Sequence, residues 1–447
     1  MTKIILLERG KEMEAKFNYG LRVRSDDLQD VLKKIHMAKG KEKGFIITIS
    51  QKGEKTSCTL TTGSDSIQAT SQFSGDLNLY KIEKNKEVLS KEPLKEPLKV
   101  TVSSVFAEAV TALGFEEFLF LKITENMVDV LNSVSNIPIP IKEQENVMVN
   151  PKGIQKLQLT ISRDEMLSVL KYVSIGATGS RYGSNYAFRP VYDGQRAYLN
   201  TFAATDTSVV AGRMGIIKTN TQEYPALCEE LPSVPLDATK FDQIIGSNDS
   251  ENIVMDFFYR DGKVGKDVVQ VNVRTNTSAY IIKPYITCYP DKVAEVLSES
   301  YEVIQYSIIF DVKTLKNVIP VLSVGSDVSK KKVEIHVYPD QIIICDEGGL
   351  SSKKKASKAS IKEVKVLLPE GQEEECFLIG LYQLNKNLKP YEGKVTMSVT
   401  GRLLVFKGPN EGIQHGIMPF KATSSTEAVV IDDTETEDAG TDESANE

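Results

Sequence analysis

The amino-acid sequence predicts an α+β protein built from three tandem domains, each made of two halves in which a helix is followed by strands. Three observations support this prediction. One amphipathic helix pattern occurs three times at corresponding positions, strand-like segments follow it, and a second helix pattern comes later in each third of the chain. The length of 447 residues is enough for about three domains of ordinary size.

The first helix pattern has apolar residues three and four positions apart, which places them on one face of a helix. Ser25, Ser162 and Asp311 stand where these helices are expected to be capped. Pro320 lies inside the third copy and is expected to kink it. One such helix indicates only a core-facing helix, whereas three in register indicate related units. The three copies are Leu28, Val31, Leu32 and Ile35; Met166, Val169, Leu170 and Val173; and Leu315, Val318, Ile319 and Leu322.

The segments after these helices are typical of strands bounded by turns. Residues 44–50 and 58–61 follow the first copy, and residues 333–337 and 341–345 follow the third. Residues 81–99 are rich in Lys and Glu and contain two prolines, which predicts a loop. The second helix of each domain is predicted at residues 103–113, 237–245 and 381–388, for six helices in all.

We predict domains at residues 1–150, 151–300 and 301–423, followed by a disordered acidic tail at 424–447. Nine of the 61 acidic residues and none of the 54 Lys and Arg residues lie at 427–447, so the net charge of −7 becomes +2 without this segment. A near-neutral body can still carry one basic face, so nucleic acid is not excluded as a partner.

Several classes of protein are disfavoured. No segment approaches the run of about 20 apolar residues that spans a bilayer, and a signal peptide is absent. The five cysteines are scattered without a C-x-x-C pair, which favours free thiols in a reducing cytoplasm over a metal site. Walker, dinucleotide-binding, H-E-x-x-H and G-x-S-x-G motifs are absent, and the three histidines are isolated. We therefore expect a cytoplasmic, non-enzymatic protein without cofactor, metal or membrane association.

Basic residues lie opposite the apolar faces of the predicted helices and in the loops beside them. Lys33 and Lys171 share one register position, which Pro320 takes in the third copy, so we expect the weakest phosphate contact there. Each lysine alone indicates only a solvated residue, but together they would suit sequence-independent contact with phosphates. The candidate DNA-binding residues are Lys33, Lys34, Lys39, Lys171, Arg181, Tyr182, Tyr186, Lys240, Lys313, Lys316, Lys386 and Lys389.

Several segments resemble the bacterial DNA polymerase III beta subunit family, the sliding clamps of replication. Residues 197–206 resemble the family's middle-domain strand that ends in Ala-Thr-Asp-Gly-His-Arg-Leu. Residues 416–421 resemble its C-terminal Val-Met-Pro-Met-Arg, and Tyr289-Pro290-Asp291 resembles its Phe-Pro-Asp-Tyr. Residues 381–395 follow its last helix and strand without a gap. The likeness covers the second and third predicted domains, and the first only in its pattern of helices and strands.

The resemblance implies three DNA-clamp domains whose helices line a ring and whose sheets lie outside. It also implies a head-to-tail homodimer around double-stranded DNA, with a replicative DNA polymerase and a clamp loader as partners. These partners would bind through short peptides in a groove between the second and third domains. The positions that match this groove are Thr205, Thr207, Val210, Pro290, Tyr382, Leu403, Val405, Ile417, Met418, Pro419 and Phe420.

The chain departs from the family at this groove, where Thr207-Ser208-Val209 replaces Gly-His-Arg, and in its acidic tail. We therefore expect a different peptide preference, and we expect the tail to screen the groove from DNA or competing partners. Two interpretations stay open. The chain is a sliding clamp that encircles DNA, or it is a clamp-fold docking protein that does not encircle it.

Overall fold

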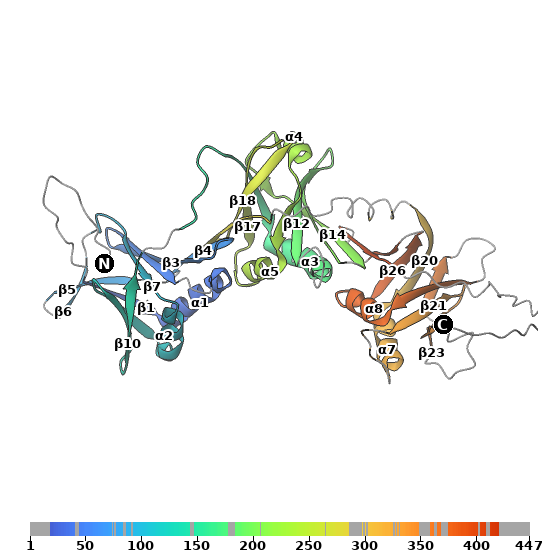
Figure 1. Cartoon of the computed structure of the whole chain (residues 1–447), viewed down its shortest axis with the longest axis horizontal. Helices are drawn as coiled ribbons and strands as arrows, with labels where there is room; N and C mark the ends of the chain where they lie inside the picture. Colours follow the sequence, from blue (N-terminus) through green and yellow to red (C-terminus); the bar gives the residue numbers. More distant parts are fainter. Residues whose placement is uncertain are drawn as a thin grey trace, which may run out of the picture.

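Three units of similar element order form an arc (Figure 1). In each unit a strand leads into a first helix, further strands lead into a second helix, and three more strands follow. The computed structural model describes residues 18–40, 44–73, 75, 77–83, 86–90, 93–143, 147–177, 184–205, 207–263, 265–285, 297, 300, 303–324, 327, 329, 331–347, 358–361, 364–367, 374–400, 403–407 and 412–419. The predicted two-half repeat and the α+β fold class are confirmed.

The elements of the three units are as follows. The first unit contains β1 (Tyr19–Arg24), α1 (Ser25–Ile35), β2 (Phe45–Lys52), β3 (Lys55–Gly63), β4 (Ile67–Gln72), β5 (Asn78–Glu83), β6 (Lys86–Leu89), β7 (Leu98–Val102), α2 (Val105–Leu113), β8 (Phe118–Ile123), β9 (Met127–Leu131) and β10 (Asn136–Lys142). The second contains β11 (Gln155–Ser162), α3 (Arg163–Val173), β12 (Asn185–Tyr192), β13 (Ala197–Ala204), β14 (Ser208–Gly215), β15 (Lys218–Thr219), α4 (Tyr224–Glu230), β16 (Val234–Asp237), α5 (Ala238–Gly246), β17 (Asn252–Asp261), β18 (Lys266–Arg274) and β19 (Ser278–Ile282). The third contains β20 (Ile304–Asp311), α7 (Val312–Ser323), β21 (Lys332–Val337), β22 (Ile342–Asp346), β23 (Lys358–Ile361), β24 (Val364–Leu367), β25 (Glu375–Gly380), α8 (Leu381–Leu388), β26 (Lys394–Thr400), β27 (Leu404–Lys407) and β28 (Ile413–Ile417).

Two sheets cross from one unit to the next. The 15-stranded sheet runs β15-β11-β17-β18-β19-β4-β3-β2-β7-β10-β9-β8-β1-β5-β6, and the 9-stranded sheet runs β16-β12-β13-β14-β28-β27-β26-β20-β24. At the crossings, β4 pairs antiparallel with β19, and β14 pairs antiparallel with β28. The third unit adds the 4-stranded sheet β23-β22-β21-β25. Backbone hydrogen bonds therefore join the three units into a continuous arc.

The helices α1, α2, α5, α3, α8 and α7 lie along the concave side of the arc, and the strands lie outside them (Figure 1). The apolar positions predicted from the helix pattern face the sheets: all of them are buried except Val318, which is half-buried. The polar face of each helix therefore points toward the concave side. No helix in the described part of the chain is both long and apolar enough to cross a membrane.

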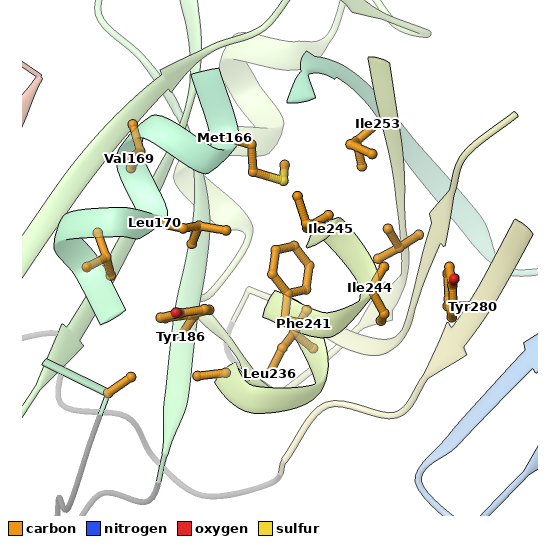
Figure 2. Packing of buried hydrophobic residues seen from close by; sticks show 14 of the residues in the cluster. Met166, Val169, Leu170, Tyr186, Leu236, Phe241, Ile244, Ile245, Ile253 and Tyr280 are labelled. Carbon is orange, nitrogen blue, oxygen red and sulfur yellow. The ribbon is translucent and has the colours of Figure 1, made fainter. Parts of the chain in front are cut away.

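The core of the second unit shows how two helices and the flanking strands share one apolar interior. Side chains from α3, α5 and the neighbouring strands point into the same space (Figure 2). Phe241 of α5 is fully buried, and its ring centroid lies 4.8 Å from that of Phe188 on β12. Removing such a ring costs about 3–5 kcal/mol because the cavity closes only partly. This packing holds the helices at fixed positions on the sheets.

Several local features differ from the predictions. Residues 81–99 are not one loop, because β5 extends to Glu83, β6 lies within the segment, and β7 begins at Leu98. Asp311 caps α7 by accepting from the Lys313 amide at 2.8 Å, but Ser162 makes no side-chain cap hydrogen bond. The helix α4 was not predicted because it has only seven residues. Pro320 is accommodated within α7, which ends three residues later at Ser323.

Candidate nucleic-acid interface and partner groove

Four exposed lysines that the sequence pattern selected lie on, or directly after, the helices of the concave side. Lys33 lies on α1 and Lys171 on α3; Lys313 lies on α7, and Lys389 follows α8. Lys171 Nζ lies 3.5 Å from a carboxylate oxygen of Glu392, and both side chains are exposed. An ion pair this exposed is weak, so Lys171 remains able to exchange Glu392 for another anion.

Other predicted lysines are engaged in contacts within the chain. Lys34 is buried and pairs with Asp30 on the same helix. Lys316 Nζ donates to the carbonyls of Lys389 at 3.2 Å and Tyr391 at 2.9 Å. Lys240 Nζ lies 3.5 Å from the Ser66 hydroxyl of the first unit. These contacts engage the three ammonium groups within the chain, so they are less available to a ligand than that of Lys33.

Three further candidates have distinct environments. Lys39 and Lys386 are half-buried, and burial lowers the pKa of Lys386. Tyr186 is fully buried and points into the core, where its hydroxyl donates to Asp242 at 2.8 Å (Figure 2). Its assignment as a DNA-binding residue is wrong, because an aromatic ring enclosed by the core cannot reach a nucleic acid. Arg181 and Tyr182 lie outside the described residues.

The predicted partner groove lies where β14 pairs with β28, at the junction of the second and third units. The Met418 amide donates to the Thr207 carbonyl at 2.8 Å. Gln383, near the start of α8, is buried, and its Nε2 donates to the carbonyls of Thr207 at 3.0 Å and Met418 at 3.2 Å. One helix thereby joins a turn of the second unit to the residue that follows the last strand of the third. Sequence reasoning had not selected Gln383.

The groove positions divide into a buried set and an accessible set. Tyr382 and Met418 are 55% and 54% exposed, and Thr205, Thr207 and Pro419 are half-buried. The buried set packs the junction and does not line an open groove, which corrects the expectation for these positions: Val210, Leu403, Val405 and Ile417. Pro290 and Phe420 lie outside the described residues.

Leu297 explains why part of this surface is closed. This fully buried side chain, from the segment between the second and third units, packs with Leu403 and Val405. It also lies against Gly416, where an added Cβ would stand 2.8 Å from the Leu297 Cδ1 atom. A larger residue at position 416 would therefore displace Leu297. Of the described groove positions, Tyr382 and Met418 are the exposed large apolar side chains.

A separate cavity of about 600 Å³ lies at the junction of the first and second units. Its lining includes Leu32 and Lys33 of α1, Ala107 of α2 and Gln243 of α5. This cavity therefore lies beside the exposed Lys33 and away from the predicted partner groove.

The tertiary structure also gathers residues that the sequence analysis treated as isolated. Glu334, His336 and Cys345 have potential ligand atoms within 4.8 Å of one another. The spacing of the cysteines along the chain predicted free thiols. Cys345 and Cys376 are present as thiols in the structure. Spacing in sequence does not reveal neighbours across strands, so the sequence could not show that Cys345 lies beside Glu334 and His336.

Comparison with known proteins identifies the fold. No protein-family model and no curated protein sequence matches the chain. Among solved structures, the Caulobacter crescentus beta sliding clamp aligns with 91% of this chain and 100% of its own, with a TM-score of 0.67 and 11% identity. The Thermotoga maritima DNA polymerase III beta subunit aligns with 90% of this chain and 99% of its own, with a TM-score of 0.65 and 13% identity.

A third solved structure agrees with these two. The DNA polymerase III subunit beta of Pseudomonas aeruginosa aligns with 90% of this chain and 100% of its own, with a TM-score of 0.65 and 10% identity. At identities this low, the alignments show that the backbones share a fold. The side-chain chemistry of the sites has to be argued from this chain's own residues. The chain therefore has the fold of the bacterial DNA polymerase III beta sliding clamps.

Proposed function

We propose that this protein is a DNA sliding clamp, a non-enzymatic processivity factor that encircles duplex DNA as a head-to-tail homodimer in the cytoplasm. The observation that carries the proposal is the continuous arc of three clamp units with helices on its concave side (Figure 1). Two such arcs can close into a ring, which holds DNA by topology. We also propose that the units correspond to domains at 1–150, 151–300 and 301–423.

The repeated strand order supports a specific closure of the ring. At both internal junctions, the third strand after the first helix of one unit pairs with the last strand of the following unit: β4 with β19, and β14 with β28. The corresponding strand of the third unit is β23, which lies at an end of its sheet. The last strand of the first unit is β10. In the proposed ring, β23 of one copy pairs with β10 of the other. The ring then contains six contacts of the same kind: two internal junctions in each copy and two contacts between the copies.

The outward edge of β10 has an unusual chemistry for such a contact. The Ile141 amide donates to the Asn126 carbonyl, which lies on the β9 side of β10. The backbone N–H and C=O groups of odd-numbered β10 residues therefore point toward β9, and those of even-numbered residues point away from it. Pro138 and Pro140 are therefore on the outward edge, where they offer carbonyls but no N–H groups. Ile141 and Lys142 at the end of this strand already pair with β7, so only residues 136–140 are open to a second copy. The two prolines protect this part of the edge from unspecific pairing and make the subunit contact weaker than the two internal junctions.

The exposed lysines support loose contact with DNA. Lys33, Lys171, Lys313 and Lys389 would meet phosphates without reading bases. A small number of exposed cations gives weak, salt-sensitive binding, which permits movement along the duplex. The accessible surface around Tyr382 and Met418 supports the second half of the proposal, in which short peptides of the replicative polymerase and the clamp loader dock with apolar anchors.

The test is topological retention. The protein is loaded onto nicked circular DNA by its loader, and bound protein is measured before and after the circle is cut. A clamp is retained on circles and lost from linear DNA. Equal retention on both forms, or a strict monomer at micromolar concentration, supports the second candidate, a clamp-fold docking protein. The weak edge of β10 is the observation that favours this second candidate.

A further inference from the structure

The outer strands of the third unit bring together a set of metal-binding side chains. Glu334 and His336 are two residues apart on β21 and therefore share one face of the 4-stranded sheet. Cys345 of β22 lies opposite Glu334, and Cys376 of β25 lies opposite His336. The register thus places one carboxylate, one imidazole and two thiols on the same face, across three adjacent strands.

The separations between these groups fit one small cation. The His336 Nε2 atom lies 3.2 Å from Glu334 Oε2 and 3.8 Å from Cys376 Sγ, and Cys345 Sγ lies 4.0 Å from Glu334 Oε2. Tetrahedral zinc has bonds of about 2.0–2.3 Å, which sets ligand atoms roughly 3.3–3.8 Å apart. Glu334, His336 and Cys345 have ligand atoms within 4.8 Å of one another, and Cys376 reaches this group through its contact with His336. Side-chain movements on the order of 1 Å would bring three or four of these groups into this geometry.

The surroundings also match those of a metal-binding histidine. The other ring nitrogen of His336, Nδ1, lies 2.8 Å from Glu374 Oε1, and the Tyr338 hydroxyl donates to the same oxygen at 3.0 Å. A carboxylate on the second nitrogen orients a ligating imidazole and leaves Nε2 to face the metal. His336 is 8% exposed and Cys345 is fully buried, so the side chains are held in place by packing.

Two other roles for these residues fit less well. Cys345 and Cys376 belong to β22 and β25, which flank β21 on opposite sides, so two interstrand spacings of nearly 5 Å separate their backbones. This exceeds the distance that a disulfide spans. A histidine paired only with carboxylates would account for Glu334 and Glu374, but not for two thiols directed at the same place.

We propose that Glu334, His336, Cys345 and Cys376 form a four-coordinate site for a thiophilic divalent cation of the zinc type, with Glu374 as a positioning residue. The mixed sulfur, nitrogen and oxygen donors favour zinc over magnesium or calcium, which prefer oxygen ligands. The bound ion fastens β22, β21 and β25 to one another. Because β22 also pairs with β23, the ion stiffens the sheet that carries the free edge of the third unit.

The first experiment uses the full-length wild-type protein, freed of metal by a chelator and titrated with Co²⁺. We expect one equivalent to bind with the visible spectrum of tetrahedral cobalt and a near-ultraviolet thiolate charge-transfer band. Zn²⁺ should displace the cobalt and raise the unfolding temperature in proportion to the logarithm of its concentration. Binding without a thiolate band, or no binding at micromolar metal, overturns the proposal without any variant having to fold.

Variants then assign the ligands. Cys376→Ser and His336→Gln should abolish the charge-transfer band or reduce its intensity, and each should lower Zn²⁺ affinity by more than 100-fold. Glu374→Gln should keep the band but weaken binding by about 10–100-fold, as expected for a group that acts through the histidine. Cys228→Ala, which removes a thiol of the second unit, should bind like the wild type. Unfolding of the metal-free forms identifies any variant that has lost its fold, and equal affinity in Cys376→Ser and Cys228→Ala contradicts the site.

Discussion

The Gln383 side chain donates to the Thr207 carbonyl at 3.0 Å, across the junction of the second and third units. The same amide nitrogen lies 3.2 Å from the Met418 carbonyl, so a single buried group holds both sides of the candidate partner groove. A hydrogen bond of this kind contributes about 0.5–1.5 kcal/mol, and two of them from one side chain make Gln383 a determinant of groove geometry.

Replacing Gln383 with Ala should lower the free energy of unfolding by about 0.5–1.5 kcal/mol, because two part-buried carbonyls each lose one hydrogen bond while the Thr207 carbonyl keeps that of the Met418 amide. Denaturant unfolding measures the change. Asn385→Ala, an exposed substitution on the same helix, is the control and should leave stability within about 0.5 kcal/mol of wild type. If both variants lose the same stability, the junction does not depend on the Gln383 amide.

Tyr382→Ala and Met418→Ala should each weaken binding of a polymerase-derived or loader-derived peptide by about tenfold or more, because each removes an accessible apolar contact. Stability should change little, since both side chains are more than half exposed. Peptide affinity is measured by fluorescence anisotropy. Val134→Ala removes an exposed apolar side chain of the first unit and serves as the control. If neither Tyr382→Ala nor Met418→Ala changes the peptide affinity, the peptide binds at another site.

Lys33→Glu combined with Lys171→Glu should weaken binding to DNA and reduce its dependence on salt. Each phosphate contact contributes about 0.9 to the slope of log affinity against log salt concentration, so the slope should fall by roughly 2. The slope is measured from dissociation of loaded protein over a range of salt concentrations. Lys99→Glu reverses an exposed charge on β7 and should have a smaller effect. If the Lys33 and Lys171 double variant and the Lys99→Glu variant change the slope equally, the concave face is not the DNA-binding surface.

Pro138→Thr and Pro140→Thr restore two N–H donors to the outward edge of β10. If β10 meets β23 of a second copy, each new hydrogen bond adds about 1 kcal/mol, so the doubly substituted dimer should bind about tenfold or more tightly. Analytical ultracentrifugation gives the dissociation constant. Pro93→Thr changes a proline outside the strands and should leave it unchanged. A folded double variant with the wild-type constant, or a weaker dimer, argues against closure through this edge.

His415 should make the folded protein sensitive to acid. It is fully buried, its Nδ1 lies 2.9 Å from the Tyr391 hydroxyl, and its Nε2 lies 2.7 Å from Asn387 Oδ1. Burial lowers its pKa from 6.5 to about 3. The unfolded state therefore binds a proton that the folded state excludes, so stability falls as the pH drops from 6.5 toward 3.

The loss attributable to His415 approaches about 1.4 kcal/mol per pH unit within this window and vanishes above it. His415→Gln should remove this part of the pH dependence, whatever its effect on stability at neutral pH. His36→Gln, at an exposed histidine, is the control and should keep the wild-type slope. Denaturant midpoints at pH 7, 6, 5 and 4.5 provide the measurement. A wild-type slope in His415→Gln assigns the acid sensitivity to other groups.

Much of the fold could be predicted because periodicity is a local property of the chain. The pattern around Leu28 and its copies predicted α1, α3 and α7, and their apolar residues are buried as expected. Short or charged elements were missed: α4 contains few residues, and β6 is fully exposed, so neither carries a clear hydrophobic pattern. The exposed Lys33 and Lys171 also follow from helical register, since they lie opposite the buried stripe.

The sequence by itself determined the α+β class, the threefold repeat and the polar side of the main helices, because these depend on residues a few positions apart. Only the tertiary structure decided which residues meet across strands and units. It buried Tyr186 and Val405, joined Gln383 to Thr207, and brought Cys345 and Cys376 to His336. These contacts depend on strand register and sheet order, which are set by the packing of the whole chain and leave no mark in local spacing.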